Sequence, residues 1–407
     1  MGKPEVLSPA GDMERLIFAV TYGADAVYLA GPDFGMRRDA GKFDEEALKQ
    51  AVTYCHTNNV KVYVTCNTLP RNEEMHRLPA FLEQADDAGV DAFILTDLGA
   101  FSMALRYAPK VERHVSTQAG IVNYESACMW HSMGASRVVL ARELTLDEIR
   151  EIRERTPKTL ELEAFVHGSM CVSFSGRCLL SNYMTGRDAN RGACAQPCRY
   201  QYALVEEKRP GEYYPIFEDA AGTYIMNAKD LCMIDHIPEV LNAGVDSLKI
   251  EGRAKTAYYS AVITNAYRHA VDAALAEEPL DPIWRAEVDK VSHRHYSTGF
   301  FYGRPEQGQY YDHSRYLRDW SVVAYVVDCD AEGNAILTQR NRFWKRDQLE
   351  LLIPGKKPVS FSVDAMQNAE GDEITIAPHP EMRIQMKLPC QAVPNSILRK
   401  CNLSAEK

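Results

Sequence analysis

Several cysteines lie close together in a stretch rich in glycine, serine, asparagine and arginine. The run HGSMCVSFSGRCLLSNYMTGRDANRGACAQPCRY begins at His167 and contains Cys171, Cys178, Cys194 and Cys198. Cys232 follows further along the chain. Thiolates that converge on one loop suit a structural zinc ion or an iron–sulfur cluster, since both take soft sulfur ligands. The CxxC pairs typical of zinc ribbons are missing, so the spacing predicts a metal without deciding which one.

Acidic and basic side chains flank this run in two strand-like segments. In LELEAFVHG, Glu163 and His167 are expected to share one face, because side chains alternate along a strand. In DSLKIEGR the same alternation groups Lys249, Glu251 and Arg253. If the two segments are neighbours, these groups meet in a polar pocket with shifted pKa values, suited to acid–base catalysis. A buried structural ion-pair network is the alternative interpretation.

Arginine and amide side chains nearby suit an anionic ligand. A guanidinium binds phosphate or carboxylate through two parallel hydrogen bonds. The arginines of the cysteine-bearing stretch are Arg177, Arg187, Arg191 and Arg199. Other polar residues stand where strand-like segments end: Asn67, Asp97, Gln118, Arg142 and Glu143. We take as candidates for substrate binding Arg177, Arg187, Arg199, Arg253, Gln118 and Arg142. A solvated surface role is the ordinary alternative for each of them.

A repeated local pattern indicates the elements that position these residues. GADAVYLA (23–30), GVDAFILT (89–96), GASRVVLA (134–141) and GVDSLKIE (244–251) each follow an amphipathic stretch. In each, a glycine ends a helix and an apolar strand begins. Four more strand-like runs lie at residues 5–10, 61–67, 112–119 and 160–168. Eight strands that alternate with helices predict an α/β fold, a (β/α)₈ TIM-like barrel, in preference to an open doubly wound sheet.

The remaining segments divide the chain into a catalytic barrel and a smaller domain. We expect the barrel at residues 1–275, with a long cysteine-bearing insertion at 169–244 between strands 7 and 8. Such an insertion at the carboxyl ends of barrel strands is where function is usually found. Short alternating strands separated by turns predict a small β-barrel domain at 315–400, after a connector at 276–314.

Composition narrows the class of protein. Hydrophobic residues make up 46% of the 407 residues, which suffices for a large core. The start of the chain lacks the apolar segment of a signal peptide, and no apolar run is long enough to span a bilayer. We therefore expect a cytoplasmic protein with no membrane partner, whose clustered cysteines bind metal rather than form disulfides. The net charge of −10 argues against nonspecific coating of nucleic acid but leaves room for a local basic patch.

The chain closely resembles the U-thirty-two family, historically called collagenase-like peptidases. The resemblance is carried by EAFVHGSMCVSFSGRCLLSNYMTGRDANRGACAQPCRYQY, FEDAAGTYIMNAKDL, SLKIEGRAKTAYY and the opening LSPAGDMERLIFAVTYGADAVYLAG. These matches cover most of residues 4–303, and the C-terminal β-domain is similar to that of the tRNA-modifying branch. Members of that branch hydroxylate the wobble uridine of tRNA at C5 to give 5-hydroxyuridine. They act without molecular oxygen and depend on prephenate.

The resemblance implies a [4Fe–4S] cluster on the insertion cysteines and prephenate as the oxygen donor or co-substrate. Cys171, Cys178 and Cys194 match the shared cysteine positions, and the fourth ligand is Cys198, with Cys232 as the alternative. The expected partners are therefore tRNA and a small carboxylate. A peptidase acting on collagen-like chains is a competing function, as are hydroxylation of another RNA base or of a quinone ring. A scaffold with a structural metal is a third class. HExxH and GxSxG motifs are absent from the sequence.

Overall fold

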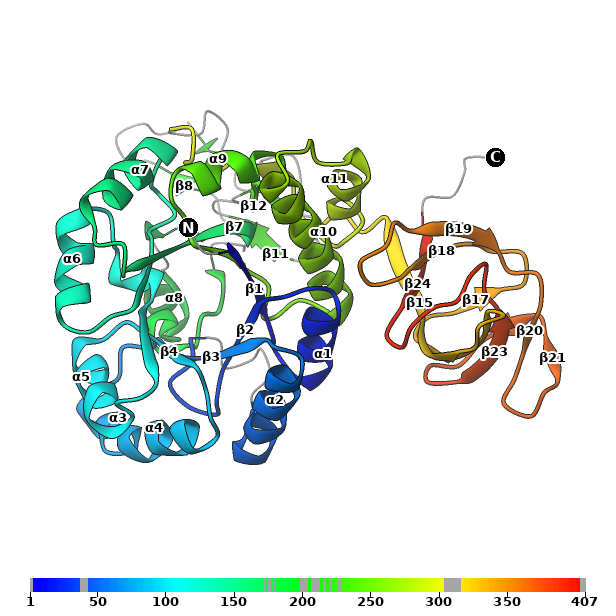
Figure 1. Cartoon of the computed structure of the whole chain (residues 1–407), viewed down its shortest axis with the longest axis horizontal. Helices are drawn as coiled ribbons and strands as arrows, with labels where there is room; N and C mark the ends of the chain where they lie inside the picture. Colours follow the sequence, from blue (N-terminus) through cyan, green and yellow to red (C-terminus); the bar gives the residue numbers. More distant parts are fainter. Residues whose placement is uncertain are drawn as a thin grey trace.

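Eight parallel strands close into a barrel, as the sequence predicts (Figure 1). The computed structural model describes residues 3–36, 43–171, 173–174, 177–178, 180–197, 229–303 and 316–402, with only the backbone of four short strands between 204 and 224. The barrel strands are β1 (Glu5–Pro9), β2 (Ala26–Leu29), β3 (Lys61–Cys66), β4 (Ala92–Leu95), β5 (Glu112–Val115), β6 (Arg137–Val139), β7 (Glu161–Ser169) and β13 (Ser247–Ile250). Each pairs with the next, and β13 pairs with both β7 and β1, which closes the ring.

Helices surround the barrel on its outside (Figure 1). They are α1 (Met13–Thr21), α2 (Glu45–Thr57), α3 (Asn72–Met75), α4 (Leu78–Asp87), α5 (Leu98–Tyr107), α6 (Tyr124–Ser132), α7 (Leu146–Arg155), α9 (Ile237–Asn242) and α10 (Ala257–Leu275). Local sequence sets their limits. The side chain of Asp12 accepts a hydrogen bond from the backbone N of Arg15 at the start of α1, 2.9 Å away. The four glycines of the repeated pattern all have positive φ, between 83° and 105°, a conformation that favours glycine.

Two further strands extend one side of the barrel, one from the insertion between β7 and β13 and one from the segment after helix α11 (Pro282–Val288). β12 (Asp230–Cys232) runs antiparallel to the end of β7, and β14 (Tyr296–Ser297) pairs with β12. Helix α8 (Leu180–Thr185) carries part of the cysteine run. The other described insertion strands are β8 (Leu204–Val205), β9 (Tyr213–Tyr214), β10 (Phe217–Asp219) and β11 (Gly222–Tyr224). The expected connector thus contributes to the barrel domain, through β14 and α11.

The C-terminal domain is a curled antiparallel sheet, drawn in orange and red in Figure 1. Its main strands follow the order β19-β18-β24-β15-β16-β23-β20-β21. The strands are β15 (Trp320–Cys329), β16 (Asn334–Gln339), β17 (Phe343–Trp344), β18 (Gln348–Leu352), β19 (Val359–Ser362), β20 (Met366–Gln367), β21 (Glu373–Ile374), β22 (Ile376–Ala377), β23 (Arg383–Lys387) and β24 (Ile397–Cys401). The sheet encloses its own apolar core.

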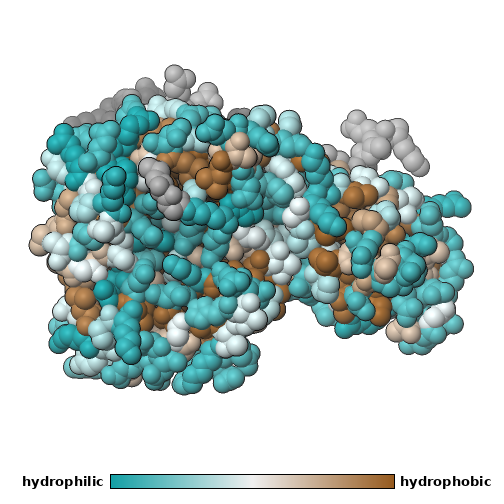
Figure 2. Space-filling view, viewed as in Figure 1, coloured by the Kyte–Doolittle hydropathy of each residue, from teal (hydrophilic) through white to brown (hydrophobic). Residues whose placement is uncertain are grey.

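Buried polar contacts attach this domain to the barrel. Arg399 of β24 is fully buried, and its guanidinium bridges Glu287 of α11 at 2.6 Å and Glu350 of β18 at 2.7 Å. The hydroxyl of Tyr22 donates to the carbonyl oxygen of Leu352 at 3.2 Å. Because a buried charge is costly unless it is paired, the network holds the two domains in a defined relation. Hydrophilic side chains cover much of the visible face, and the domains meet at a narrow waist (Figure 2). No helix in the described part of the chain is long and apolar enough to cross a membrane.

Candidate active site at the barrel mouth

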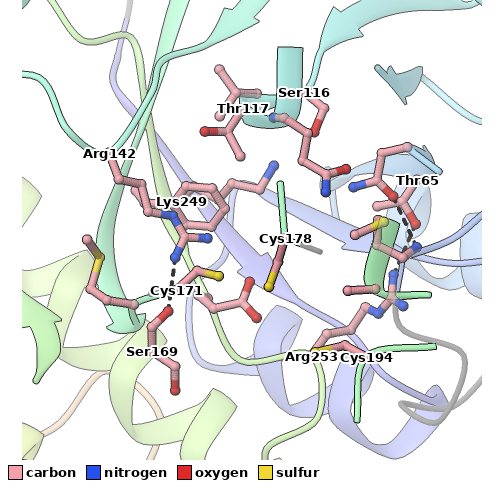
Figure 3. A pocket seen from close by; sticks show the side chains of 18 of the residues that line it. Thr65, Ser116, Thr117, Arg142, Ser169, Cys171, Cys178, Cys194, Lys249 and Arg253 are labelled. Atoms are coloured by element: carbon pink, nitrogen blue, oxygen red, sulfur yellow. Dashed lines mark hydrogen bonds between the residues drawn. The ribbon is translucent and has the colours of Figure 1, made fainter. Parts of the chain in front are cut away.

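A cavity of about 200 Å³ opens where the barrel strands end (Figure 3). This is the end of a (β/α)₈ barrel at which active sites are found. Strand ends and the loops after them supply Tyr28, Thr65, Asn67, Ile94, Ser116, Thr117, Gln118, Arg142, Phe165, Lys249, Glu251 and Arg253. The insertion supplies three cysteines and a short segment around Gln196. We call this cavity the mouth pocket.

Beneath the pocket, the barrel interior holds a chain of buried charges. The ammonium of Lys249 lies 2.6 Å from one carboxylate oxygen of Glu163. The guanidinium of Arg137 lies 3.1 Å from the other oxygen and 2.6 Å from Glu5. Burial by itself raises the pKa of Glu163, but the positive charges of Lys249 and Arg137 outweigh it and lower that pKa. Each carboxylate oxygen of Glu163 therefore pairs with a cation, and Glu163 does not line the mouth pocket.

Lys249 links this network to the pocket. Its ammonium lies 4.7 Å from the ring centre of Tyr28 and 5.4 Å from that of Phe165, so two aromatic faces and a carboxylate fix its position. Glu251, two residues on, faces the same pocket and accepts a hydrogen bond from the Tyr28 hydroxyl at 3.3 Å. The floor thus combines an ammonium with a carboxylate, as the alternation along the strand predicts.

Arginine and amide groups form the sides of the pocket. Arg142 stacks over the ring of Phe165 at 3.9 Å and donates to the carbonyl oxygen of Ser169 at 2.9 Å. Arg253 is 4% exposed and donates to the Thr65 hydroxyl at 3.0 Å. Gln118 is buried, and its side-chain oxygen has no hydrogen-bond partner among the described residues. A buried polar oxygen without a partner is costly, so a ligand donor is the natural complement.

The other predicted arginines lie elsewhere. Arg177 is exposed, and its Nε donates to the backbone oxygen of Gln118 at 2.5 Å, so it braces the pocket from outside. Arg187 is exposed and does not line the pocket. Arg199 lies outside the described residues. Arg191 is bound to Glu74 at 2.9 Å.

Three predicted metal ligands converge on the pocket. Cys171, Cys178 and Cys194 all line it, and Figure 3 shows their side chains around one region of the mouth. The Sγ atom of Cys178 accepts a hydrogen bond from the backbone N of Leu180 at 3.3 Å. The Sγ atom of Cys194 accepts one from the backbone N of Gln196 at 3.4 Å. Backbone N–H donors to sulfur stabilise thiolates and tune iron–sulfur clusters, so this donor set fits a cluster.

The spacing of these sulfurs bears on the kind of metal. No three His, Cys, Asp or Glu side chains in the described part of the chain lie close enough to hold a single metal ion. A cluster of several iron and sulfide atoms has its ligands further apart than a zinc ion has. Cys171, Cys178 and Cys194 are the pocket residues that would hold such a cluster. Cys198, the expected fourth ligand, lies outside the described residues.

His167 does not face the pocket, so the prediction that it shares a face with Glu163 is wrong. The register of β7 against β13 shifts by one residue between Phe165 and His167, a bulge that turns the following side chain to the other side. The imidazole Nδ1 instead lies 3.2 Å from the hydroxyl of Tyr267 on α10. Burial, aided by nearby positive charge, lowers the pKa of His167 well below its ordinary value.

Cys232 also lies on this outer side. It pairs with His167 across β12 and β7, and its Sγ is 4.0 Å from the Tyr267 hydroxyl. Burial raises the pKa of its thiol to about 11. Cys232 is not among the residues that line the mouth pocket, whereas Cys171, Cys178 and Cys194 are. This placement argues against Cys232 as the fourth ligand of the metal site.

Comparison with known proteins assigns the chain to a family. The profile of peptidase family U32 matches residues 11–310, and that of the U32 C-terminal domain matches residues 318–399. The chain belongs to peptidase family U32. The resemblance inferred from the cysteine run is thereby confirmed.

Relatives within U32 carry names from two kinds of chemistry. The tRNA hydroxylation protein P1 of Bacillus subtilis is 37% identical over 404 residues, which cover 98% of this chain and 95% of that protein. The 23S rRNA 5-hydroxycytidine synthase of Escherichia coli is 37% identical over 289 residues, which are 71% of this chain and 42% of that protein. A collagenase of Porphyromonas gingivalis is 35% identical over 313 residues, 74% of each chain.

The U32 pocket also contains residues that the sequence analysis did not single out. Thr65, Ser116 and Thr117 line it from the ends of β3 and β5, and Arg137 and Glu5 anchor its floor from below. Hydroxyl residues at strand ends are too common to be noticed alone. Charged residues inside otherwise apolar strands are rarer, and Glu5 and Arg137 could have been found by that signal.

Proposed function

We propose that this U32 chain is a tRNA-modifying enzyme that hydroxylates uridine at C5, with an iron–sulfur cluster and prephenate as co-substrate. The observation that carries the proposal is the mouth pocket, in which Lys249 and Glu251 face the thiols of Cys171, Cys178 and Cys194. The names of two relatives, one acting on tRNA and one on rRNA, support an RNA base as substrate. A base that is flipped out of its strand can enter such a cavity.

The pocket residues suit a pyrimidine edge. Uracil presents one N–H donor between two carbonyl acceptors. The side-chain oxygen of Gln118 can accept from that N–H, and the hydroxyls of Ser116 and Thr117 lie beside it on the same loop. Phe165 offers an apolar face, although Arg142 already stacks on one side of it. The unpartnered oxygen of Gln118 therefore favours a ligand that presents an N–H donor, as a uracil edge does.

The floor supplies charge and proton transfer. Lys249, held by Glu163, places a positive charge where negative charge develops on a pyrimidine oxygen during substitution at C5. Glu251 is the proposed acceptor of the proton that C5 loses when its C–H bond becomes C–OH. Glu163 acts by positioning Lys249. His167, which lies outside the pocket, acts by holding β7 against α10.

Cys171, Cys178, Cys194 and Cys198 would hold a [4Fe–4S] cluster beside this floor. Such a cluster supplies one-electron chemistry and a Lewis-acidic iron. The oxidising equivalents and the oxygen atom must come from a co-substrate, for which we propose prephenate. Arg142 and Arg253 are suited to hold its carboxylates by charge-assisted hydrogen bonds.

A peptidase is the second candidate, because one relative is named collagenase. Nucleophilic proteolysis needs a base within hydrogen-bond reach of a serine, threonine or cysteine. No histidine is among the described residues that line the mouth pocket. The acid–base pair of the pocket is instead a lysine and a carboxylate, an arrangement that fits hydroxylation as proposed.

A deletion strain tests the proposal. Total tRNA from the strain, digested to nucleosides and analysed by mass spectrometry, is expected to lack 5-hydroxyuridine and its derivatives. A plasmid copy restores them, and a copy with Lys249→Met does not. If the modification persists in a strain without any U32 paralogue, the proposed function is wrong. Cleavage of gelatin by the purified protein, lost in Lys249→Met, would favour the peptidase.

A further inference from the structure

A second cavity lies between the barrel and the C-terminal domain. Its volume is about 670 Å³, and its walls come from the start of α1, the segment that joins β13 to α10, and the start of β15. Ser169, Gln196 and Glu251 line both this cavity and the mouth pocket. The two spaces are therefore adjacent. We call the second cavity the interdomain cleft.

Positive charge gathers in the interdomain cleft of a chain whose net charge is −10. The basic residues that line it are Arg15, Lys255, Arg318 and Arg340, against two acidic ones, Glu14 and Glu251. Arg340 forms ion pairs with Glu14 and Glu381, and Arg15 forms one with Asp12. Arg318 differs from both, because it is exposed and forms no ion pair among the described residues. Its Nε donates to the Ser292 hydroxyl at 3.3 Å, which leaves its terminal N–H groups for an anionic ligand.

Aromatic rings alternate with these cations. The ring of Tyr316 has the ammonium of Lys255 at 4.2 Å and the guanidinium carbons of Arg294 and Arg318 at 5.0 and 5.9 Å. Trp320, on the same wall, has the ammonium of Lys290 at 4.5 Å. Both rings are only partly buried. Stacking faces interleaved with cations are the features by which proteins bind single-stranded nucleic acid.

We propose that the interdomain cleft binds the single-stranded RNA next to the target base, with Tyr316 as a stacking platform and Arg318 as a phosphate ligand. This inference rests on the proposed function. It also explains how an acidic protein can hold an anionic substrate: the cleft concentrates the positive charge at one place, beside the pocket that takes the base. The buried Arg399 network joins the two domains that form the cleft.

An acidic peptide is a different occupant, and the structure favours RNA over it. A peptide would use the cations but has no flat rings to match Tyr316 and Trp320. A nucleotide strand presents both phosphates and bases, and the cleft wall offers both a guanidinium, that of Arg318, and the rings of Tyr316 and Trp320. The shared border with the mouth pocket lets one continuous strand fill both spaces.

Binding measurements with a short fluorescein-labelled oligouridylate test the proposal on the full-length protein. Arg318→Gln is expected to weaken binding about tenfold and to reduce the slope of log K against log salt by about 0.7, the value for one phosphate contact in a single strand. Tyr316→Ala is expected to weaken binding about five- to hundredfold, whereas Tyr316→Phe, which keeps the ring, binds like the wild type. The matched control is Arg383→Gln, because Arg383 is exposed on the same domain and lines neither cavity.

The outcomes separate this inference from the function on which it rests. Wild-type affinity and salt slope in both Arg318→Gln and Tyr316→Ala would overturn the cleft as an RNA site. Displacement of the oligouridylate by polyglutamate at equal charge would overturn it in favour of an acidic peptide. Whether the wild-type gene restores 5-hydroxyuridine in the deletion strain decides the proposed function independently. If it does and the two variants restore it equally well, the function stands and the cleft does not.

Discussion

Replacing Arg137 by methionine should destabilise the barrel in a way that depends on pH. The guanidinium is 3% exposed, and it pairs with Glu5 at 2.6 Å and Glu163 at 3.1 Å. In the variant, Glu163 still forms its ion pair with Lys249. Glu5 loses its ion pair and retains the hydrogen bonds that it accepts from Tyr63 and Ser247. Removing one partner of a buried pair costs about 3–5 kcal/mol, because the other charge stays buried.

The pKa of Glu5 makes the effect of the substitution depend on pH. Burial raises this pKa, but Arg137 outweighs burial and the net pKa falls from 4.5 to about 2. A lowered pKa stabilises the fold above the unfolded value of 4.5, and this contribution is lost as pH falls from there toward 2. In Arg137→Met the pKa of Glu5 should instead lie above 4.5, so the variant gains stability as the pH falls from neutral.

Urea unfolding followed by circular dichroism measures both effects. The free energy of unfolding of Arg137→Met should be about 3–5 kcal/mol below that of the wild type at neutral pH, and the gap should narrow near pH 4.5. Adding Glu5→Gln should recover part of the loss. The control Arg150→Met removes an exposed ion pair with Asp147 and should change stability by less than about 1 kcal/mol. A loss below about 1 kcal/mol in Arg137→Met, or a gap independent of pH, would refute the reasoning.

Two further predictions concern the pocket itself. The Cys178→Ser variant, purified without oxygen, should retain less iron per chain than the wild type. The control is Cys390→Ser, which should retain all of the iron because Cys390 is exposed and lies outside the pocket. Equal iron in both variants would contradict the proposed ligand set. Gly168→Ala should lower activity at least about tenfold, because Gly168 has a φ of 107° and an added Cβ would overlap the carbonyl oxygen of Glu251. Normal activity with normal folding would show that the close approach of Gly168 to Glu251 does not shape the pocket.

The barrel could be predicted because its signals are local. The glycines at 23, 89, 134 and 244 each end a helix one short step before a strand, and all adopt the positive φ that this requires. Eight parallel strands, each followed by a helix, are the number that closes into a barrel in the (β/α)₈ fold. Alternation along the strand predicts Lys249, Glu251 and Arg253 on one face, and all three line the mouth pocket, although β13 ends at Ile250 and the last two lie in the segment after it.

Other features depend on contacts between distant segments. The orientation of His167 is set by a bulge in the pairing of β7 with β13, and alternation along one strand cannot reveal it. The antiparallel pairing of β12 with β7 likewise moves Cys232 to the outer side of the barrel. Sequence spacing alone does not decide between Cys198 and Cys232 as the fourth ligand, whereas the structure shows that Cys232, unlike Cys171, does not line the mouth pocket. The interdomain cleft needs both domains in place and leaves no local pattern.

The most direct test of the central claim is a reaction with purified components. The protein is reconstituted with iron and sulfide under anaerobic conditions and incubated with unmodified tRNA transcript and prephenate, and the nucleosides are then analysed by mass spectrometry. The account predicts 5-hydroxyuridine with wild-type protein, little with Lys249→Met, and none when prephenate is omitted. Unchanged uridine with fully reconstituted wild-type protein, or equal product without prephenate, would contradict it.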